Sequence, residues 1–188
     1  MVNVGYKVLF ALSFWTMTTE AFPKGNQRIK CHLAKYKSLP PQELEAFKKA
    51  KDTFEDIMLL SDRKCSTRIF HRNWEVKELS VRKTVILVEK ELDFTINVLE
   101  NVDDPSLSKL LSRPLEILTQ IREDLRGCVS IQQTHSHRHS RRLNNWLQNF
   151  RKSKETETPE CREASVILNL FRLLNEDLRC AAYRELCV

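Results

Sequence analysis

Residues 158–188 read TPECREASVILNLFRLLNEDLRCAAYRELCV, and the rest of the chain is best interpreted around this stretch. Apolar residues recur in it at steps of three and four, which is typical of one face of a helix. Val166, Leu170 and Leu173 widen that face to about 220° of the circumference, roughly twice what a surface helix needs. The helix therefore lies either at the centre of a bundle or against a partner. Thr158 and Pro159 are the predicted N-cap and first helical residue.

The composition favours an all-α protein. The chain has 188 residues, enough for one domain with a real core, and only three glycines. So few glycines leave no Gly-rich phosphate loop and few tight hairpin turns.

The N-terminus has the pattern of a secretory leader. Lys7 precedes an apolar run from Val8 to Met17, and Thr19 and Ala21 suit a cleavage site. The run is too short to cross a bilayer, and no later stretch is long and uncharged enough to do so. We predict a signal peptide at residues 1–21, a single helical domain at residues 22–188 and secretion to the extracellular space.

Secretion makes disulfides the expected state of the six cysteines, which can pair in about 15 ways. No Cys-x-x-Cys spacing occurs, so a zinc site is not expected.

The first half of the chain predicts two helices joined by a long connection. A helix starts near Pro41 and buries Leu44, Phe47, Phe54, Ile57 and Met58. The period stops from Ser61 to Asn73, where Ile69, Phe70 and Trp74 would need burial on the bundle. The next helix spans Leu79 to Glu100, because its continuing period outweighs the β-branched run Thr84–Val88.

The second half predicts further helices. Asp103, Asp104 and Pro105 begin one that is kinked near Pro114 and stops at Gly127. A short helix runs from Arg141 to Phe150, and a charged linker, Arg151–Glu157, leads to the final helix.

Two other functions, metal binding and catalysis, have little support in the sequence. His135, His137 and His139 at two-residue spacing form either a metal site or a solvated loop, and we favour the loop. No metal or cofactor is therefore expected. The chain contains no GxSxG, HExxH or catalytic-cysteine signature, so we predict no enzyme activity and no catalytic residue.

The net charge of +6 raises the question of an anionic partner. Lys and Arg are interspersed with Asp and Glu along the helices, so nucleic-acid binding is not expected. A denser basic region is either an ordinary solvated face or a contact for sulfated polysaccharide. Its residues are Arg138, Arg141, Arg142, Arg151, Lys152 and Lys154.

Two classes of protein fit these features: a receptor-binding signalling bundle, and a structural or membrane-active secreted module. Uneven helices, a long first connection and an over-apolar final helix favour the signalling bundle.

Five stretches carry a resemblance to a known family. They are CHLAKYKSLPPQELEAFKKAKD at residues 31–52, the pair Asn73–Trp74, VRKTVILVEKELDFTINVLE at 81–100, CREASVILNLFRLL at 161–174 and DLRCAAYRELCV at 177–188. Their residues and order resemble the type III interferons, the interferon lambda family, over essentially the whole predicted mature chain.

The resemblance implies a monomeric class II four-helix-type cytokine bundle with extra short helices, a long first crossover loop and disulfide staples. It implies binding to the interferon-lambda receptor alpha subunit, recruitment of the interleukin-10 receptor beta subunit and antiviral JAK–STAT signalling, mainly in epithelia. Alternatives are another interleukin-10/interferon-family cytokine and a secreted polysaccharide-binding helical module.

In the family, the first receptor contacts the first helix, the long connection and the last helix, and the second contacts the side of the first helix and the helix after Pro105. The matching positions here are Phe47, Lys48, Lys49, Asp52, Leu168, Phe171 and Arg172. The plain alternative is core for Phe47, Leu168 and Phe171, and solvated surface for Lys48, Lys49 and Arg172. We expect Trp74 to be a plug for the connection rather than a receptor contact. Lys64 and Leu168 stand where the family commonly has aromatic residues.

The resemblance also implies the pairing Cys31–Cys128, Cys65–Cys161 and Cys180–Cys187. The helix order agrees with it: if the first and last helices are neighbours, Cys65 after the first helix can reach Cys161 at the start of the last.

Overall fold

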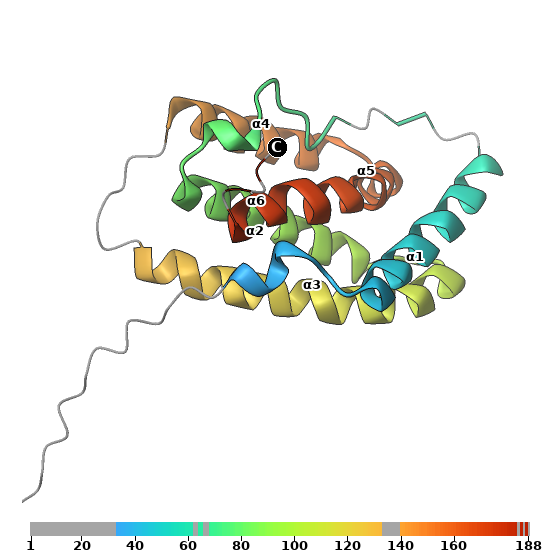
Figure 1. Cartoon of the computed structure of the whole chain (residues 1–188). Coiled ribbons are helices and arrows are strands. Elements are labelled where there is room, and N and C mark those ends of the chain that lie inside the picture. Colours follow the sequence, from blue (N-terminus) through green and yellow to red (C-terminus); the bar gives the residue numbers. More distant parts are fainter. Residues whose placement is uncertain are drawn as a thin grey trace, which may run out of the picture.

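The computed structural model describes residues 33–61, 64–65, 68–132, 140–183, 185 and 187. These residues form a helical bundle without strands, so the predicted all-α class is confirmed for them (Figure 1). The predicted signal peptide lies outside the described residues and stays a prediction. The elements are η1 (Leu33–Lys37), α1 (Pro41–Leu59), η2 (Val76–Glu78), α2 (Val81–Leu99), α3 (Pro105–Gln132), α4 (Arg141–Thr156), α5 (Pro159–Arg172), η4 (Leu173–Leu178) and α6 (Arg179–Ala182).

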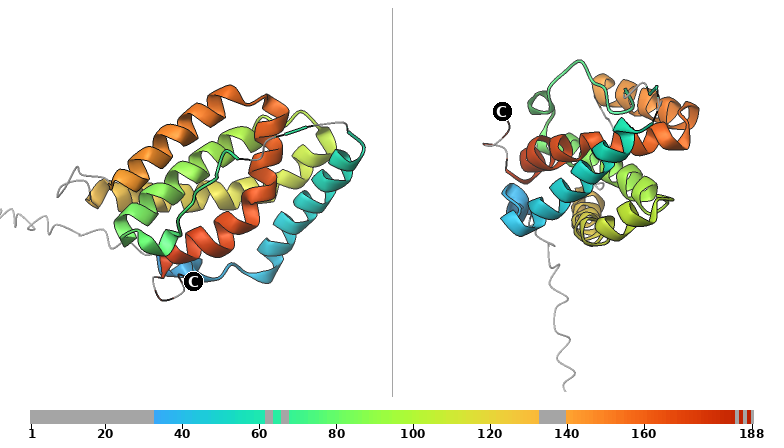
Figure 2. Two further views of the ribbon diagram at one scale, coloured as in Figure 1. Left: turned by 90° about the horizontal axis from the view of Figure 1, so that it is seen from above. Right: turned by 90° about the vertical axis from the view of Figure 1, so that its right-hand side faces the viewer.

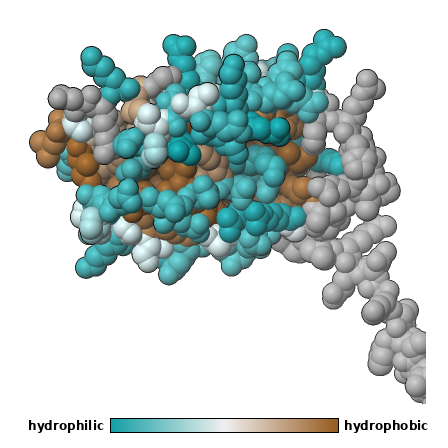
Figure 3. All heavy atoms as spheres, turned by 180° about the vertical axis from the view of Figure 1, so that it is seen from behind, coloured by the Kyte–Doolittle hydropathy of each residue, from teal (hydrophilic) through white to brown (hydrophobic). Residues whose placement is uncertain are grey.

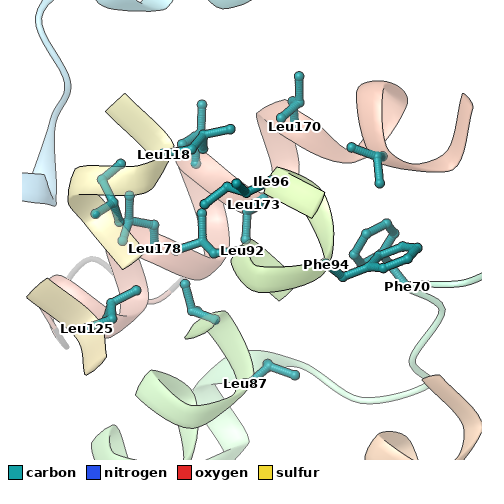
Figure 4. Close-up of a cluster of buried hydrophobic side chains, with 14 of the residues drawn as sticks. Phe70, Leu87, Leu92, Phe94, Ile96, Leu118, Leu125, Leu170, Leu173 and Leu178 are labelled. Carbon is teal, nitrogen blue, oxygen red and sulfur yellow. The ribbon is translucent and has the colours of Figure 1, made fainter. Parts of the chain in front are cut away.

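Helix α2 is buried on several sides and packs against α3, α5, η4 and α6. Figure 4 shows its Leu92 and Ile96 in one apolar cluster with Leu118 of α3 and Leu173 of η4. The β-branched run Thr84–Val88 lies inside this helix, as its period predicts.

Helix α3 begins as predicted but ends later. Asp104 accepts the backbone N–H groups of Ser106 and Leu107, both at 2.9 Å, and so caps the helix. The predicted stop at Gly127 is wrong, because α3 continues to Gln132. No described glycine has a positive φ, so Gly127 does not form a left-handed C-cap. Its helical cost of about 1 kcal/mol is outweighed where Leu125 and Cys128 are buried beside it.

Helix α4 is longer than its apolar pattern indicates. Residues predicted as a charged linker, Arg151–Glu157, are helical to Thr156. Arg, Lys and Glu are good helix formers, and here they prolong the helix beyond its last buried residue, Phe150. Hydrophobic periodicity cannot detect a helical turn that buries nothing.

The final helix begins where predicted. The Thr158 hydroxyl accepts the Cys161 N–H at 3.3 Å, and Pro159 occupies the first turn. Val166, Leu170 and Leu173 are buried, so most of the wide apolar face lies inside the bundle. The sequence reading missed η4, a π-helical turn that carries α5 into α6 and buries Asp177.

The long connection between α1 and α2 is held down at several points. Ile69 and Phe70 are buried and Trp74 is half-buried, as predicted. A disulfide joins Cys65 to Cys161 at the start of α5, and another joins Cys180 to Cys187; these are two of the three predicted pairs. Cys128 is disulfide-bonded, and the Cys31 end of the remaining predicted pair lies outside the described residues.

Helices α1 and α4 lie on opposite sides of the bundle, which Figure 2 shows from two directions. Helix α3 packs against α1 and α2. Among the described helices, none combines the length and hydrophobicity that crossing a membrane requires.

Candidate functional site

The predicted charged contacts of α1 lie on its solvent face. Lys48, Lys49 and Asp52 are exposed, and Lys48 is 4.0 Å from Asp52. An exposed pair one turn apart adds little stability, so these side chains remain free for a partner.

The predicted contact Phe47 lies elsewhere. Its side chain is 0% exposed and belongs to the core with Ala50 and Phe54. A side chain without accessible surface offers nothing to a partner, so its core alternative is the one that the structure supports.

The last residue of α1, Leu59, and its C-cap, Leu60, are both exposed apolar residues. Leu59 is 83% exposed and Leu60 is 92% exposed. Leu59 falls off the three/four period of the buried stripe, and that was the signal in the sequence that could have found it. Leu60 keeps a step of three from Ile57 but follows the last residue of the helix. A hollow lined by Ile57, Pro159 and Glu160 places this end of α1 beside the start of α5.

Helix α5 adds a second apolar element to the same side of the bundle. Leu168 is 39% exposed, and Phe171 is partly exposed while packing against the core. Phe171 therefore contributes to the core, and its role as a receptor contact stays a prediction. Figure 1 shows α1, the connection and α5 close together on one side of the molecule.

Arg172 was predicted to face a receptor, yet most of its bonds are internal. It donates to the Phe70 carbonyl at 3.2 Å and lies 3.5 Å from Glu91 and 3.9 Å from Asp177. Arg172 therefore holds the connection against α5. Its role as a receptor contact stays a prediction, which its partly exposed side chain allows.

A buried ion cluster, Arg72–Glu91–Asp177, joins the connection to α2 and η4. Arg72 binds Asp177 through both terminal nitrogens, with Nη1 3.0 Å from Oδ2, and Nη1 also lies 3.2 Å from Glu91 Oε1. The Arg72 side chain is 7% exposed and the two carboxylates 0%. The sequence reading missed this cluster, because nothing in a local pattern pairs residues 72 and 177.

Burial and the neighbouring Asp177 carboxylate raise the pKa of Glu91 well above its usual range, although Arg72 and Arg172 oppose the shift. For Arg72, burial lowers the pKa, but the Glu91 and Asp177 carboxylates outweigh it and raise the pKa overall. The folded state thus holds a proton on Glu91 more tightly than the unfolded chain does.

Glu91→Gln is expected to stabilise the protein progressively, relative to wild type, as pH rises. A raised folded pKa adds stability below the unfolded pKa of about 4.3, and that stability is lost as pH rises through the folded pKa. The neutral amide does not titrate. Thermal unfolding between about pH 5 and pH 8 measures the difference. Glu45→Gln, at an exposed site of α1, is the control, and a difference between Glu91→Gln and wild type that is independent of pH would contradict the assignment.

Aromatic rings support the far end of the connection. Phe70 packs on Phe94 and Phe150, with ring centroids 5.8 and 5.6 Å away, and the Arg72 guanidinium lies 5.8 Å from the Trp74 ring. Trp74 is thus held in the connection, in line with the plug alternative. Lys64, where the family commonly has an aromatic residue, is exposed.

The predicted basic region is divided over α4. Arg138 lies outside the described residues, as do His135, His137 and His139. Arg142 is paired with Glu78 of η2, whereas Arg141, Arg151 and Lys152 are exposed. In the described part of the chain, no group of three His, Cys, Asp or Glu residues is placed to hold a metal ion.

Comparison with known proteins finds matches over most of the chain. The family model described as interleukin-28A matches residues 28–184. Interferon lambda-3 of Gallus gallus is 46% identical over 187 residues, covering 100% of both chains. Interferon lambda-2 of Mus musculus is 44% identical, covering 84% of this chain and 82% of the relative, and interferon lambda-1 of Homo sapiens is 40% identical, covering 84% and 79%.

Proposed function

Because this chain belongs to the interferon lambda family, the type III interferons, whose members are cytokines and not enzymes, we propose that it is a secreted antiviral cytokine acting through a two-subunit class II receptor. The interferon-lambda receptor alpha subunit binds first, and the interleukin-10 receptor beta subunit joins to start JAK–STAT signalling. The chain acts as a monomer after removal of residues 1–21.

One observation carries the proposal for the first receptor. The apolar side chains left in solvent include Leu59 and Leu60 at the end of α1 and Leu168 on α5, and these two helices contact each other. The charged residues Lys48 and Asp52 are exposed further back along α1. An apolar centre with a charged border is the usual composition of a protein interface. The Cys65–Cys161 disulfide and the Arg72–Glu91–Asp177 cluster hold the intervening connection in a preformed position, which lowers the entropic cost of binding.

The second receptor subunit is assigned to the side formed by α1 and α3. Arg113 of α3 lies 3.2 Å from Glu43 of α1, and Lys35 of η1 lies 2.6 Å from Asp124 of α3. The first contact joins α3 to α1 and the second joins α3 to η1, so these elements form one continuous surface for the second subunit.

Leu60→Asp is expected to weaken binding to the alpha subunit about tenfold or more, because a carboxylate would be desolvated where an apolar contact was made. Folding should not change, since the side chain is 92% exposed. Binding to each purified receptor ectodomain, alone and together, measures the effect, and circular dichroism and melting check the fold.

Val81→Asp is the matched control, because Val81 is also an exposed apolar residue but starts α2 at the other end of the bundle (Figure 1). It should bind both subunits as wild type does. Equal binding of Leu60→Asp and wild type would remove the end of α1 from the interface. If the wild-type protein bound neither subunit, the proposed function would be wrong.

A further inference from the structure

A hollow between α2, α3 and α4 has a basic rim and an apolar floor. Its cations are Lys90 of α2, Arg122 of α3, and Arg151 and Lys154 of α4. Phe94, Leu147 and Phe150 form the floor. Figure 3, which shows the molecule from behind, has hydrophilic residues bordering hydrophobic ones over this side of the bundle.

Positive charge is in excess in this hollow. Four cations face two carboxylates, Asp93 and Glu100. Asp93 is bound by Arg126 at 2.6 Å, with Arg122 at 3.7 Å, and Lys90 lies 2.9 Å from Glu89. Arg151 and Lys154 form no ion pair with another described residue, so these two supply the excess positive charge. An anion entering the hollow therefore meets a net positive field.

The side chains that α4 contributes to the hollow all lie on one face of the helix. Leu147, Phe150, Arg151 and Lys154 are spaced by three and four residues, so they share a side of the helix. The Lys154 ammonium lies 5.8 Å from the Phe150 ring and 6.0 Å from the Phe94 ring, which holds it over the floor. Arg151 forms no ion pair with another described residue, so its guanidinium is available to an anion.

We propose that this hollow binds the sulfate groups of a sulfated polysaccharide. A guanidinium and ammonium groups suit sulfate oxygens, while the sugar hydroxyls between sulfates can donate to Asp93 and Glu100 and accept from the Asn97 amide. A nucleic-acid backbone, with an anionic phosphate at every unit, would bring negative charge against the Glu100 carboxylate, which has no ion pair with another described residue.

The site differs from the contiguous basic region that the sequence indicates. Arg141 and Lys152 are eleven residues apart, about three helical turns, so they lie on one side of α4. Lys154 lies on roughly the opposite side, and Arg151 lies about a quarter of a turn from both Arg141 and Lys152. Arg142 is engaged by Glu78. The hollow thus draws its cations from three helices, and only two of them, Arg151 and Lys154, belong to the basic region.

The hollow is lined by α2, α3 and α4, and α4 lies on the side of the bundle opposite α1 (Figure 2). Polysaccharide bound there leaves the proposed alpha-subunit surface open, so the cytokine can be retained near its source and still bind its receptor. The inference does not depend on the proposed function, because polysaccharide binding and receptor binding are measured separately.

The test compares two double variants of the full mature chain, Arg151→Gln with Lys154→Gln, and Arg141→Gln with Lys152→Gln. Both remove two positive charges from α4, so they have the same net charge. Affinity for a defined heparin oligosaccharide at physiological ionic strength is expected to fall about tenfold in the first variant and less than about twofold in the second. Melting curves and receptor binding of both variants should match wild type.

Equal losses in the two variants would show that binding follows net charge and would overturn the site. So would binding of desulfated heparin as tight as that of heparin, since the sulfates would then play no part. Equal affinity for double-stranded DNA or for anionic lipid vesicles would overturn the assignment of the ligand class. If Arg151→Gln with Lys154→Gln melts lower, Arg151→Gln alone, at the exposed position, must still weaken heparin binding relative to Arg141→Gln.

Discussion

Replacing Arg72 by methionine is expected to lower the free energy of unfolding by about 3–5 kcal/mol, because it leaves the Asp177 and Glu91 carboxylates buried without their main cation. Total stability is typically about 5–15 kcal/mol, so the loss is a large fraction of it. The connection from residue 68 to residue 74 also loses its bond to α2 and η4. Chemical denaturation at neutral pH measures the change.

Two companion variants isolate the cause. Arg68→Met removes an exposed arginine from the same connection and should change stability by less than about 0.5 kcal/mol. Adding Glu91→Gln and Asp177→Asn to Arg72→Met should recover much of the loss, since no unpaired charge then remains buried. If Arg72→Met were as stable as Arg68→Met, the cluster would have no structural role.

Replacing both Cys65 and Cys161 by serine is expected to cost about 4–5 kcal/mol before any change in native-state strain. The disulfide spans 96 residues of sequence, and the entropy that it removes from the unfolded chain grows with that length. It also holds the connection at the start of α5. Secretion should therefore collapse, and any folded protein should bind the alpha subunit poorly, which yield in culture medium and a receptor-binding assay would show.

The Cys180–Cys187 bridge provides the control, because it spans only 7 residues. Its double serine variant should lose about 2.5 kcal/mol, so it should be secreted at a higher level. Equal yields from the two variants would mean that loop length does not govern the effect of these disulfides.

The two large effects act on the same segment. Cys65 holds one end of the connection and Arg72 the other, and both contact the α5–η4 helix. The losses of stability from Arg72→Met and from the Cys65/Cys161 double variant should therefore be less than additive when they are combined. Once one end of the connection is released, the contact at the other end stabilises the fold less.

The sequence by itself determined the features that depend on neighbours along the chain. The three/four period of α1, α2 and α5 places those helices, and Asp104 and Thr158 mark two of the helix starts, because caps and amphipathic faces are set within a few residues. The family resemblance, carried by stretches of sequence, also implied the pairing of Cys65 with Cys161. The ends of α3 and α4 were misjudged because Gly127 and the charged residues after Phe150 are compatible with both a helix and a loop.

Only the tertiary structure decided which side chains reach solvent and which charges meet inside. Phe47 and Leu168 have equally apolar side chains, yet one is fully buried and the other exposed, since each depends on what packs against its helix. Arg72 and Asp177 are 105 residues apart, and Asp177 is buried within the π-helical turn of η4. Hydrophobic periodicity describes one helix at a time, whereas burial and ion pairing arise only when several helices pack together.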